Sequence, residues 1–125
     1  MSYFGRRYKV KDPQSLVVDG IRFDSKLEVA HYRKLKMMEK AGEIRDVAYH
    51  TKYTFVVNGV EVGTYEADFT FMEKSEERFR IPRIHDVKAW KTDKRNGKKK
   101  PILGPADTLR KNLMNACFGL EVEYV

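Results

Sequence analysis

The sequence predicts an α/β domain built on a mixed sheet. Three stretches in the middle of the chain alternate apolar and polar residues at the two-residue period of a strand. Two segments with the apolar spacing of an amphipathic helix flank these stretches, and a short apolar strand follows the second helix. The order is therefore hairpin, helix, three strands, helix and strand, which is typical of a sandwich-like α/β domain.

The first segments are a basic arm and a β-hairpin. Residues 1–15 are basic and irregular, so we expect them to form an N-terminal arm outside a single domain of residues 16–125. The following segment, LVVDGIRF, holds two short apolar runs joined by Asp19-Gly20. An Asp-Gly pair suits the positive φ angles of a two-residue type I′ turn, so a hairpin is expected here.

The first helix is expected over residues 25–41. Ser25 and Glu28 have the spacing of a capping box, and Gly42 marks the C-terminal end. The expected apolar stripe of this helix comprises Leu27, His31, Leu35, Met38 and Ala41. Glu28 lies at the edge of that stripe, so its carboxylate can extend along the surface on which the helix packs.

The remaining elements follow from alternation and turn residues. Asn58-Gly59 predicts a second type I′ turn between two strands. The strand after this turn carries Glu66 and Asp68 on one face, and Pro82 suggests an edge or a bulge near the start of the third strand. The expected elements are strands over 46–57, 60–72 and 79–90, a helix over 105–117 and a last strand after Gly119.

Length and composition exclude several classes of protein. The 125 residues suit one domain, and the single cysteine, Cys117, excludes a disulfide scaffold. No set of cysteines and histidines has zinc-finger spacing. Because no apolar run approaches the roughly 18 residues of a membrane span and the N-terminus lacks a signal-peptide pattern, we expect a soluble, cytoplasmic protein without a membrane partner.

One segment carries most of the charge excess of +7. Residues 88–100, KAWKTDKRNGKKK, contain seven Lys or Arg and one Asp, a net charge of +6, so the rest of the chain is nearly neutral. Such a segment is typical of a contact to a phosphate backbone, because each neutralised phosphate releases condensed counterions. A solvated, disordered loop is the alternative interpretation of a lysine run.

The candidate chemistry begins directly before the rest of that basic segment. Asp86 and Lys88 are two positions apart on a strand, so their side chains share a face, while Val87 faces the other way. A carboxylate that holds Mg²⁺ beside a lysine that stabilises developing charge suits phosphodiester hydrolysis. The triplet alone is weak evidence, because roughly two acidic-x-Lys triplets are expected by chance and a surface ion pair also explains it.

Further carboxylates make the pattern more specific. Asp68 lies on the preceding strand, 18 residues before Asp86, so two neighbouring strands can bring the two carboxylates together. Glu66 shares the face of Asp68 and is a competing ligand. Glu28 can supply a third carboxylate from the helix, although a capping box also explains its position.

These residues resemble those of the small phage-encoded endonucleases of the PD-(D/E)XK, or restriction-endonuclease-like, superfamily. The resemblance spans residues 16–125: VVDGIRFDSKLEVAHYRKLKMMEKAGEI is similar to the family's N-terminal block, YEADFTF to its first metal-binding strand, and HDVKAWKT to its second, followed by the helix and GLEVEYV. It implies a restriction-endonuclease-like core of a helix, a three-strand meander, a helix and a strand, with a mixed central sheet and an N-terminal β-hairpin.

The resemblance also implies roles for individual residues. Asp68 and Asp86 would bind Mg²⁺ or Mn²⁺, and the backbone carbonyl of Val87 would add a ligand. Lys88 would be the catalytic lysine, and Glu28 matches the helix carboxylate that helps to order the site.

The chain departs from the family pattern at several positions. His85 stands where an acidic residue is common, Ala89 where glycine is common and His50 where glutamine is expected, and the insert at 94–100 is long. None of these departures removes a metal ligand. His85 could change the metal preference or the pH response, because imidazole titrates near neutrality.

The expected function is that of a metal-dependent DNA endonuclease. The resemblance implies phage DNA processing or recombination in the host cytoplasm, with branched DNA such as a Holliday junction as a substrate and a homodimer as the working form. The residues expected to bind DNA are Lys91, Thr92, Lys94, Arg95, Lys98, Lys99 and Lys100, with Arg6 and Arg7 from the arm.

Two alternatives from other classes remain open. A non-catalytic nucleic-acid-binding module on the same fold explains the charge but leaves the inward carboxylates unexplained. An interaction protein whose lysine segment docks on an acidic partner explains the charge equally well.

Overall fold

The structure is a computed structural model that describes residues 16–125. The expected arm over 1–15, with Arg6 and Arg7, lies outside the described residues. The described part begins with a short antiparallel pair, β1(Val17–Val18) and β2(Ile21–Arg22). Asp19 and Gly20 join the two strands with φ angles of 52° and 76°, as the predicted type I′ turn requires.

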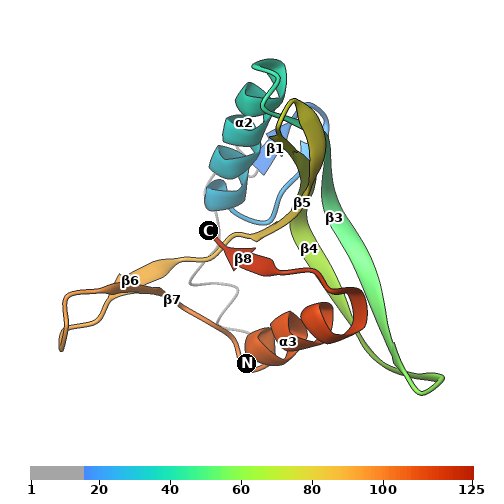
Figure 1. The fold of residues 1–125 in the computed structure, drawn as a ribbon. Helices are drawn as coiled ribbons and strands as arrows, with labels where there is room; N and C mark the ends of the chain where they lie inside the picture. The colour runs from blue at the N-terminus through green and yellow to red at the C-terminus, as the bar shows by residue number, and fades with distance from the viewer. Residues whose placement is uncertain (1–15) are drawn as a thin grey trace.

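The central sheet is mixed, as predicted, and its strand order is β3-β4-β5-β8 (Figure 1). The strands β3(Ile44–Val57), β4(Val60–Ser75) and β5(Arg78–Asp86) form an antiparallel meander, and β8(Val122–Tyr124) adds in parallel to β5. Only residues 84–86 of β5 pair with β8, so Pro82 lies where β5 has a neighbour on one side alone. A proline is tolerated there because it lacks a ladder N–H group.

The two helices are α2(Lys26–Lys40) and α3(Asp107–Phe118). Ser25 caps α2 by accepting a hydrogen bond of 3.1 Å from the backbone N–H of Glu28. The predicted apolar stripe was wrong at its ends, because Leu27 and Ala41 are exposed and Glu28, Val29, Tyr32 and Leu35 are buried. The helix is rotated toward the aromatic contact between Tyr32 and Phe23, whose ring centroids lie 4.9 Å apart.

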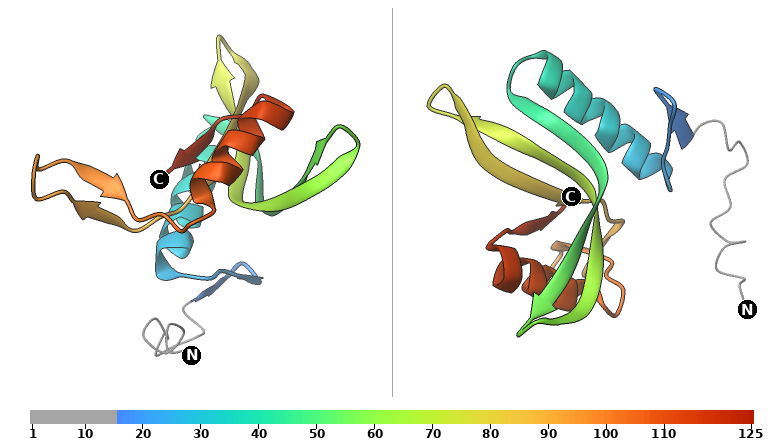
Figure 2. Two further views of the ribbon diagram at one scale, coloured as in Figure 1. Left: turned by 90° about the horizontal axis from the view of Figure 1, so that it is seen from below. Right: turned by 90° about the vertical axis from the view of Figure 1, so that its right-hand side faces the viewer.

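Two apolar cores lie along the long β3–β4 hairpin, one against each helix (Figures 1 and 2). The first core contains Leu16, Phe23, Val29, Tyr32, Leu35, Ile44, Phe69 and Phe71. The second core contains Phe55, Tyr65, Ala67, Ile84, Met114 and Val122. Because Ala67 belongs to one core and Phe69 to the other, the backbone on both sides of Asp68 is held by packing.

The chain after β5 differs from the expected strand over 79–90. That strand ends at Asp86, where its pairing with β8 ends, and Trp90 belongs to a separate hairpin of β6(Trp90–Thr92) and β7(Lys99–Pro101). Figure 2 shows this hairpin extending away from the sheet and both helices. The lysine-rich segment is therefore an ordered antiparallel hairpin, called the basic hairpin below, and not a disordered loop. None of the helices in the described residues is long and apolar enough to cross a membrane.

Candidate functional site

The structure brings Asp68, Asp86 and Lys88 together at the junction of the two cores. Asp68, on β4, accepts a hydrogen bond of 2.8 Å from the backbone N–H of Val87, directly after β5. The Asp86 carboxyl group lies within hydrogen-bonding reach of the Asp68 carboxyl group, and Asp86 is only 8% exposed. Two neighbouring strands thus place two largely buried carboxyl groups side by side.

This environment changes the protonation of Asp68. Burial raises the pKa of Asp68 to about 8, and the hydrogen bond with Asp86 and the charge of Glu28 act in the same direction. The Val87 N–H lowers the pKa but does not offset these effects. Two carboxyl groups held together in a low-dielectric site share a proton at neutral pH unless a cation lies between them and allows both to ionise. The pair is therefore suited to hold a divalent cation.

Lys88 completes the group as a cation. Its Nζ lies 3.5 Å from Asp86 Oδ2 and donates a hydrogen bond of 3.2 Å to Asp107 Oδ2. Burial lowers the pKa of Lys88, but the charges of Asp86 and Asp107 outweigh that effect and raise it above its ordinary value. Lys88 is therefore protonated at neutral pH and is held in place by two carboxylates.

Asp107 is the first residue of α3, and the sequence pattern assigned it no role in the site. Its Oδ2 accepts the Lys88 bond and also a bond of 2.6 Å from the backbone N–H of Gly104. Its backbone carbonyl accepts a hydrogen bond of 3.2 Å from the Tyr124 hydroxyl on β8. Asp107 thus connects the start of α3 to Lys88 and to the edge of the sheet.

A cavity of about 350 Å³ opens onto this group. It is lined by Thr64, Tyr65, Glu66, Asp86, Lys88, Asp107 and Arg110. Glu66, the competing ligand, is exposed at this cavity, while Arg110 adds a cation that sequence reasoning missed. A substrate entering the cavity would therefore meet Asp86 and Lys88 directly. The Tyr65 hydroxyl is buried beside them, and burial followed by the charge of Asp86 raises its pKa.

Glu28 is buried and faces His50. Glu28 Oε1 is 3.7 Å from His50 Nε2. Among the described residues, one set of three possible metal ligands has all its ligand atoms within 4.8 Å of one another, and it is Asp24, Glu28 and His50. Burial, followed by the charge of Asp24, raises the pKa of Glu28, and the Asp86 charge adds to it. Glu28 thus interacts electrostatically with Asp86 across the site.

His85 lies away from the two aspartates. It pairs with Phe69 in the β4–β5 ladder, and its Nδ1 lies 2.9 Å from His31 Nε2 on α2. Burial is the main effect that lowers the pKa values of both His31 and His85 to about 4. Both rings are therefore neutral near pH 7, so His85 gives the site no titratable charge there.

The basic hairpin presents its charged residues to solvent. Lys91 lies opposite Lys100, and Thr92 lies opposite Lys99. Lys91, Thr92, Lys94, Arg95, Lys98, Lys99 and Lys100 are all exposed. Asp93 forms ion pairs of 3.3 Å with both Arg95 and Lys100 and is the one acidic residue in the basic hairpin.

The buried carboxyl groups predict a specific pH dependence of stability without metal. His31 and His85 titrate near pH 4 in the folded protein and near pH 6.5 in the unfolded chain. Their contribution to stability therefore rises with pH up to about 6.5 and is constant above it. Asp68 keeps its proton to about pH 8 when folded but loses it near pH 4 when unfolded, so its contribution falls as the pH rises through that range. Above pH 6.5 the Asp68 effect is therefore unopposed by the histidines.

In EDTA, the melting temperature is expected to fall between pH 6.5 and 8. Asp68→Asn should remove most of this decline, whereas Asp46→Asn, at an exposed turn-like position of β3, should leave it intact. Thermal melts at half-unit pH intervals test this expectation. A wild-type curve that is flat over this range would contradict the raised pKa of Asp68.

Comparison with known families places most of the chain in one of them. A family model described as "Protein of unknown function (DUF1064)" matches residues 6–112. No curated protein and no solved structure matches the chain.

Proposed function

The chain belongs to the DUF1064 family, whose function is unknown, and from its site we propose that it is a metal-dependent DNA endonuclease with a PD-(D/E)XK, restriction-endonuclease-like core. The observation that carries the proposal is the side-by-side burial of Asp68 and Asp86 next to the Lys88 cation, at a cavity open to substrate. A purely structural role would not require two buried carboxyl groups that repel each other.

The residues present fit a hard divalent cation. Asp68 and Asp86 supply carboxylate oxygens, the ligands that Mg²⁺ and Mn²⁺ prefer, and the Val87 carbonyl is the third proposed ligand. Burial, the hydrogen bond with Asp86 and the charge of Glu28 raise the pKa of Asp68, and a bound divalent cation would offset these effects. A bound Mg²⁺ or Mn²⁺ would polarise the phosphate and lower the pKa of a water molecule.

The side chains of this protein have distinct tasks in the proposed hydrolysis. A water oxygen attacks phosphorus, the bond to the leaving deoxyribose oxygen breaks, and negative charge builds up on the phosphoryl oxygens. Lys88 lies where it can donate to those oxygens or orient the water, and its charge is permanent at neutral pH. Asp107 keeps Lys88 beside Asp86 and therefore acts as a positioning residue.

The basic hairpin is the proposed surface for the DNA backbone. Like charges directly opposite each other destabilise a strand pair, so the Lys91–Lys100 pair favours binding to a polyanion. A two-stranded ribbon also has the size that a major groove admits. The hairpin starts two residues after Lys88, so bound DNA would be held next to the cavity.

The proposed biological setting is phage DNA processing or recombination. The contacts that the hairpin offers are to phosphates and carry little sequence information, which is consistent with a substrate recognised by shape. A four-way junction is therefore the first branched substrate to test, and a homodimer is the proposed form that cuts two strands.

The test is cleavage of supercoiled plasmid and of a synthetic four-way junction with Mg²⁺ or Mn²⁺. Wild-type protein is expected to cut in at least one metal, and EDTA is expected to stop the reaction. If the protein shifts both DNAs at low salt but cuts neither in either metal, it is a non-catalytic binding module and the nuclease proposal fails.

The hairpin makes a separate prediction about affinity. Replacing Lys94, Lys98 and Lys99 with alanine is expected to weaken DNA binding and to reduce the slope of log K against log salt by up to about 3, since each lost phosphate contact removes about 0.9. Fluorescence anisotropy at several salt concentrations measures this slope. The matched control replaces the exposed lysines 36, 40 and 52, and an equal loss of slope there would exclude the hairpin as the main DNA contact.

A further inference from the structure

A second cluster of metal-ligating side chains lies beside the two aspartates. Asp24 precedes the N-cap of α2, Glu28 is in the first turn of that helix, and His50 is on β3. Their ligand atoms all lie within 4.8 Å of one another. Two segments of the chain, the start of α2 and β3, thus converge on one point with two carboxylates and one imidazole.

The polar atoms at the centre of this cluster are unsatisfied. Glu28 is only 6% exposed, and neither its Oε1 nor His50 Nε2 has a hydrogen-bond partner among the described residues, although both atoms are buried. The two atoms lie 3.7 Å apart, which is too far for a hydrogen bond. Buried polar atoms without a partner are costly, so their alignment indicates a missing bound species.

The distances suit a metal ion as that species. Ligand atoms about 2.1 Å from one ion can be up to about 4.2 Å apart, so the Glu28 and His50 atoms need no rearrangement. Asp24 is exposed and can approach by the few tenths of an ångström required. An imidazole ligand favours the first-row transition-metal ions, the series from Mn²⁺ to Zn²⁺, over Mg²⁺. The reason is that Mg²⁺ prefers ligand sets of oxygen alone.

The cluster is also next to the proposed nuclease centre. Tyr49 and Thr51 of β3 pair with Phe69 and Ala67 of β4, which places His50 across from Asp68. The charge of Glu28 acts on both Asp68 and Asp86. Glu28 therefore links the two groups of ligands electrostatically.

We propose that Asp24, Glu28 and His50 form a second metal site, selective for a first-row transition-metal ion over Mg²⁺ and adjacent to the Asp68–Asp86 pair. The site does not require the proposed cleavage, but any part it takes in catalysis rests on that function. Its presence would make this protein bind two ions of different preference.

The binding test uses the full chain, Mn²⁺ and no DNA. Wild-type protein is expected to bind two Mn²⁺ ions in an EPR titration, and the Asp68→Asn/Asp86→Asn double variant is expected to keep one. Adding His50→Gln to the double variant should weaken the remaining site by more than about 100-fold. Adding His31→Gln instead is the matched control and should leave that Mn²⁺ bound, since His31 pairs with His85 and packs against Phe69 and is not one of the three clustered ligands.

A spectroscopic readout identifies the imidazole itself. Pulsed EPR of Mn²⁺ in the Asp68→Asn/Asp86→Asn variant should show ¹⁴N modulation, which His50→Gln abolishes and an excess of Mg²⁺ does not. No Mn²⁺ binding in the double variant, or binding without ¹⁴N modulation, would overturn the proposal. Because these measurements need no DNA, failure of cleavage and failure of the second metal site are seen separately.

Discussion

Replacing Asp86 with asparagine is expected to reduce DNA cleavage by about 10³-fold or more, because a cation bound at the site contributes several kcal/mol to the transition state and each 1.36 kcal/mol is tenfold. Asparagine keeps the shape of the side chain but removes its charge, so the ion loses a central ligand. DNA affinity should change little, since the proposed contacts to the DNA backbone lie on the hairpin. Plasmid cleavage and anisotropy measured on the same preparation separate the two effects.

The matched control is Glu66→Gln. Glu66 lines the same cavity as Asp86, but its side chain is exposed. Its loss should change cleavage by no more than a few-fold. Asp86→Asn should also raise the melting temperature in EDTA at pH 8, because it relieves repulsion with Asp68, and this result shows that the variant is folded. Cleavage that survives Asp86→Asn but not Glu66→Gln would move the metal to Glu66.

The elements that the sequence predicts well are those determined by local chemistry. The turns at Asp19-Gly20 and Asn58-Gly59 need positive φ angles. The preference of these residue pairs for such angles is local and does not depend on neighbouring residues. Ser25 begins α2 where its hydroxyl can accept a backbone hydrogen bond. Period-two alternation likewise places Asp68 and Asp86 on their strands, because side-chain direction in a strand follows from the backbone alone.

The missed features depend on contacts between distant segments. Asp107 binds Lys88 only because α3 begins beside the end of β5, and no periodicity in the sequence encodes that meeting. His50 has a φ of 56°, a left-handed conformation that a strand pattern does not predict, and its neighbours Asp24 and Glu28 come from a different part of the chain. The rotation of α2 toward Tyr32 could not be predicted from the sequence either. Leu27 and Val29 define two overlapping apolar stripes, and the sequence does not show which of them is buried.

The position of the basic segment sharpens the division between binding and chemistry. The side chain of Lys88 is 17% exposed and is held by Asp86 and Asp107, whereas the lysines after Trp90 are exposed on the basic hairpin. One continuous run of positive charge in the sequence therefore forms two separate parts of the structure, a lysine at the cavity and an exposed basic hairpin. The first residue of the run faces the cavity, and the others face solvent.

Replacing Lys88 with alanine is expected to lower the cleavage rate about 10²- to 10³-fold, with little change in DNA affinity, because its charge acts on negative charge that develops only in the transition state. The expected signature is a fall in kcat at constant KM. Asp107→Asn should have the same direction and a smaller effect, since Lys88 keeps its contact with Asp86. Single-turnover cleavage and anisotropy measure the two quantities.

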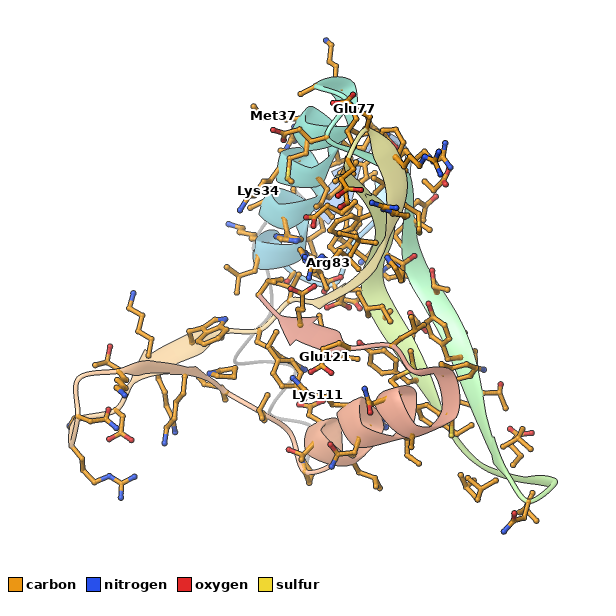
Figure 3. All side chains as sticks on the ribbon, in the orientation of Figure 1. Lys34, Met37, Glu77, Arg83, Lys111 and Glu121 are labelled. Carbon is orange, nitrogen blue, oxygen red and sulfur yellow. The ribbon has the colours of Figure 1, made fainter. Side chains whose placement is uncertain are left out.

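Lys111 provides the matched control for Lys88. Both ammonium groups lie over the ring of Tyr124, at 5.0 Å for Lys111 and 5.7 Å for Lys88, but Lys111 pairs with Glu121 at 3.4 Å (Figure 3). Lys111→Ala should therefore leave kcat unchanged. If Lys88→Ala weakens DNA binding as much as it slows cleavage, or if Lys111→Ala slows cleavage equally, Lys88 is an ordinary backbone contact and has no special role in the chemistry.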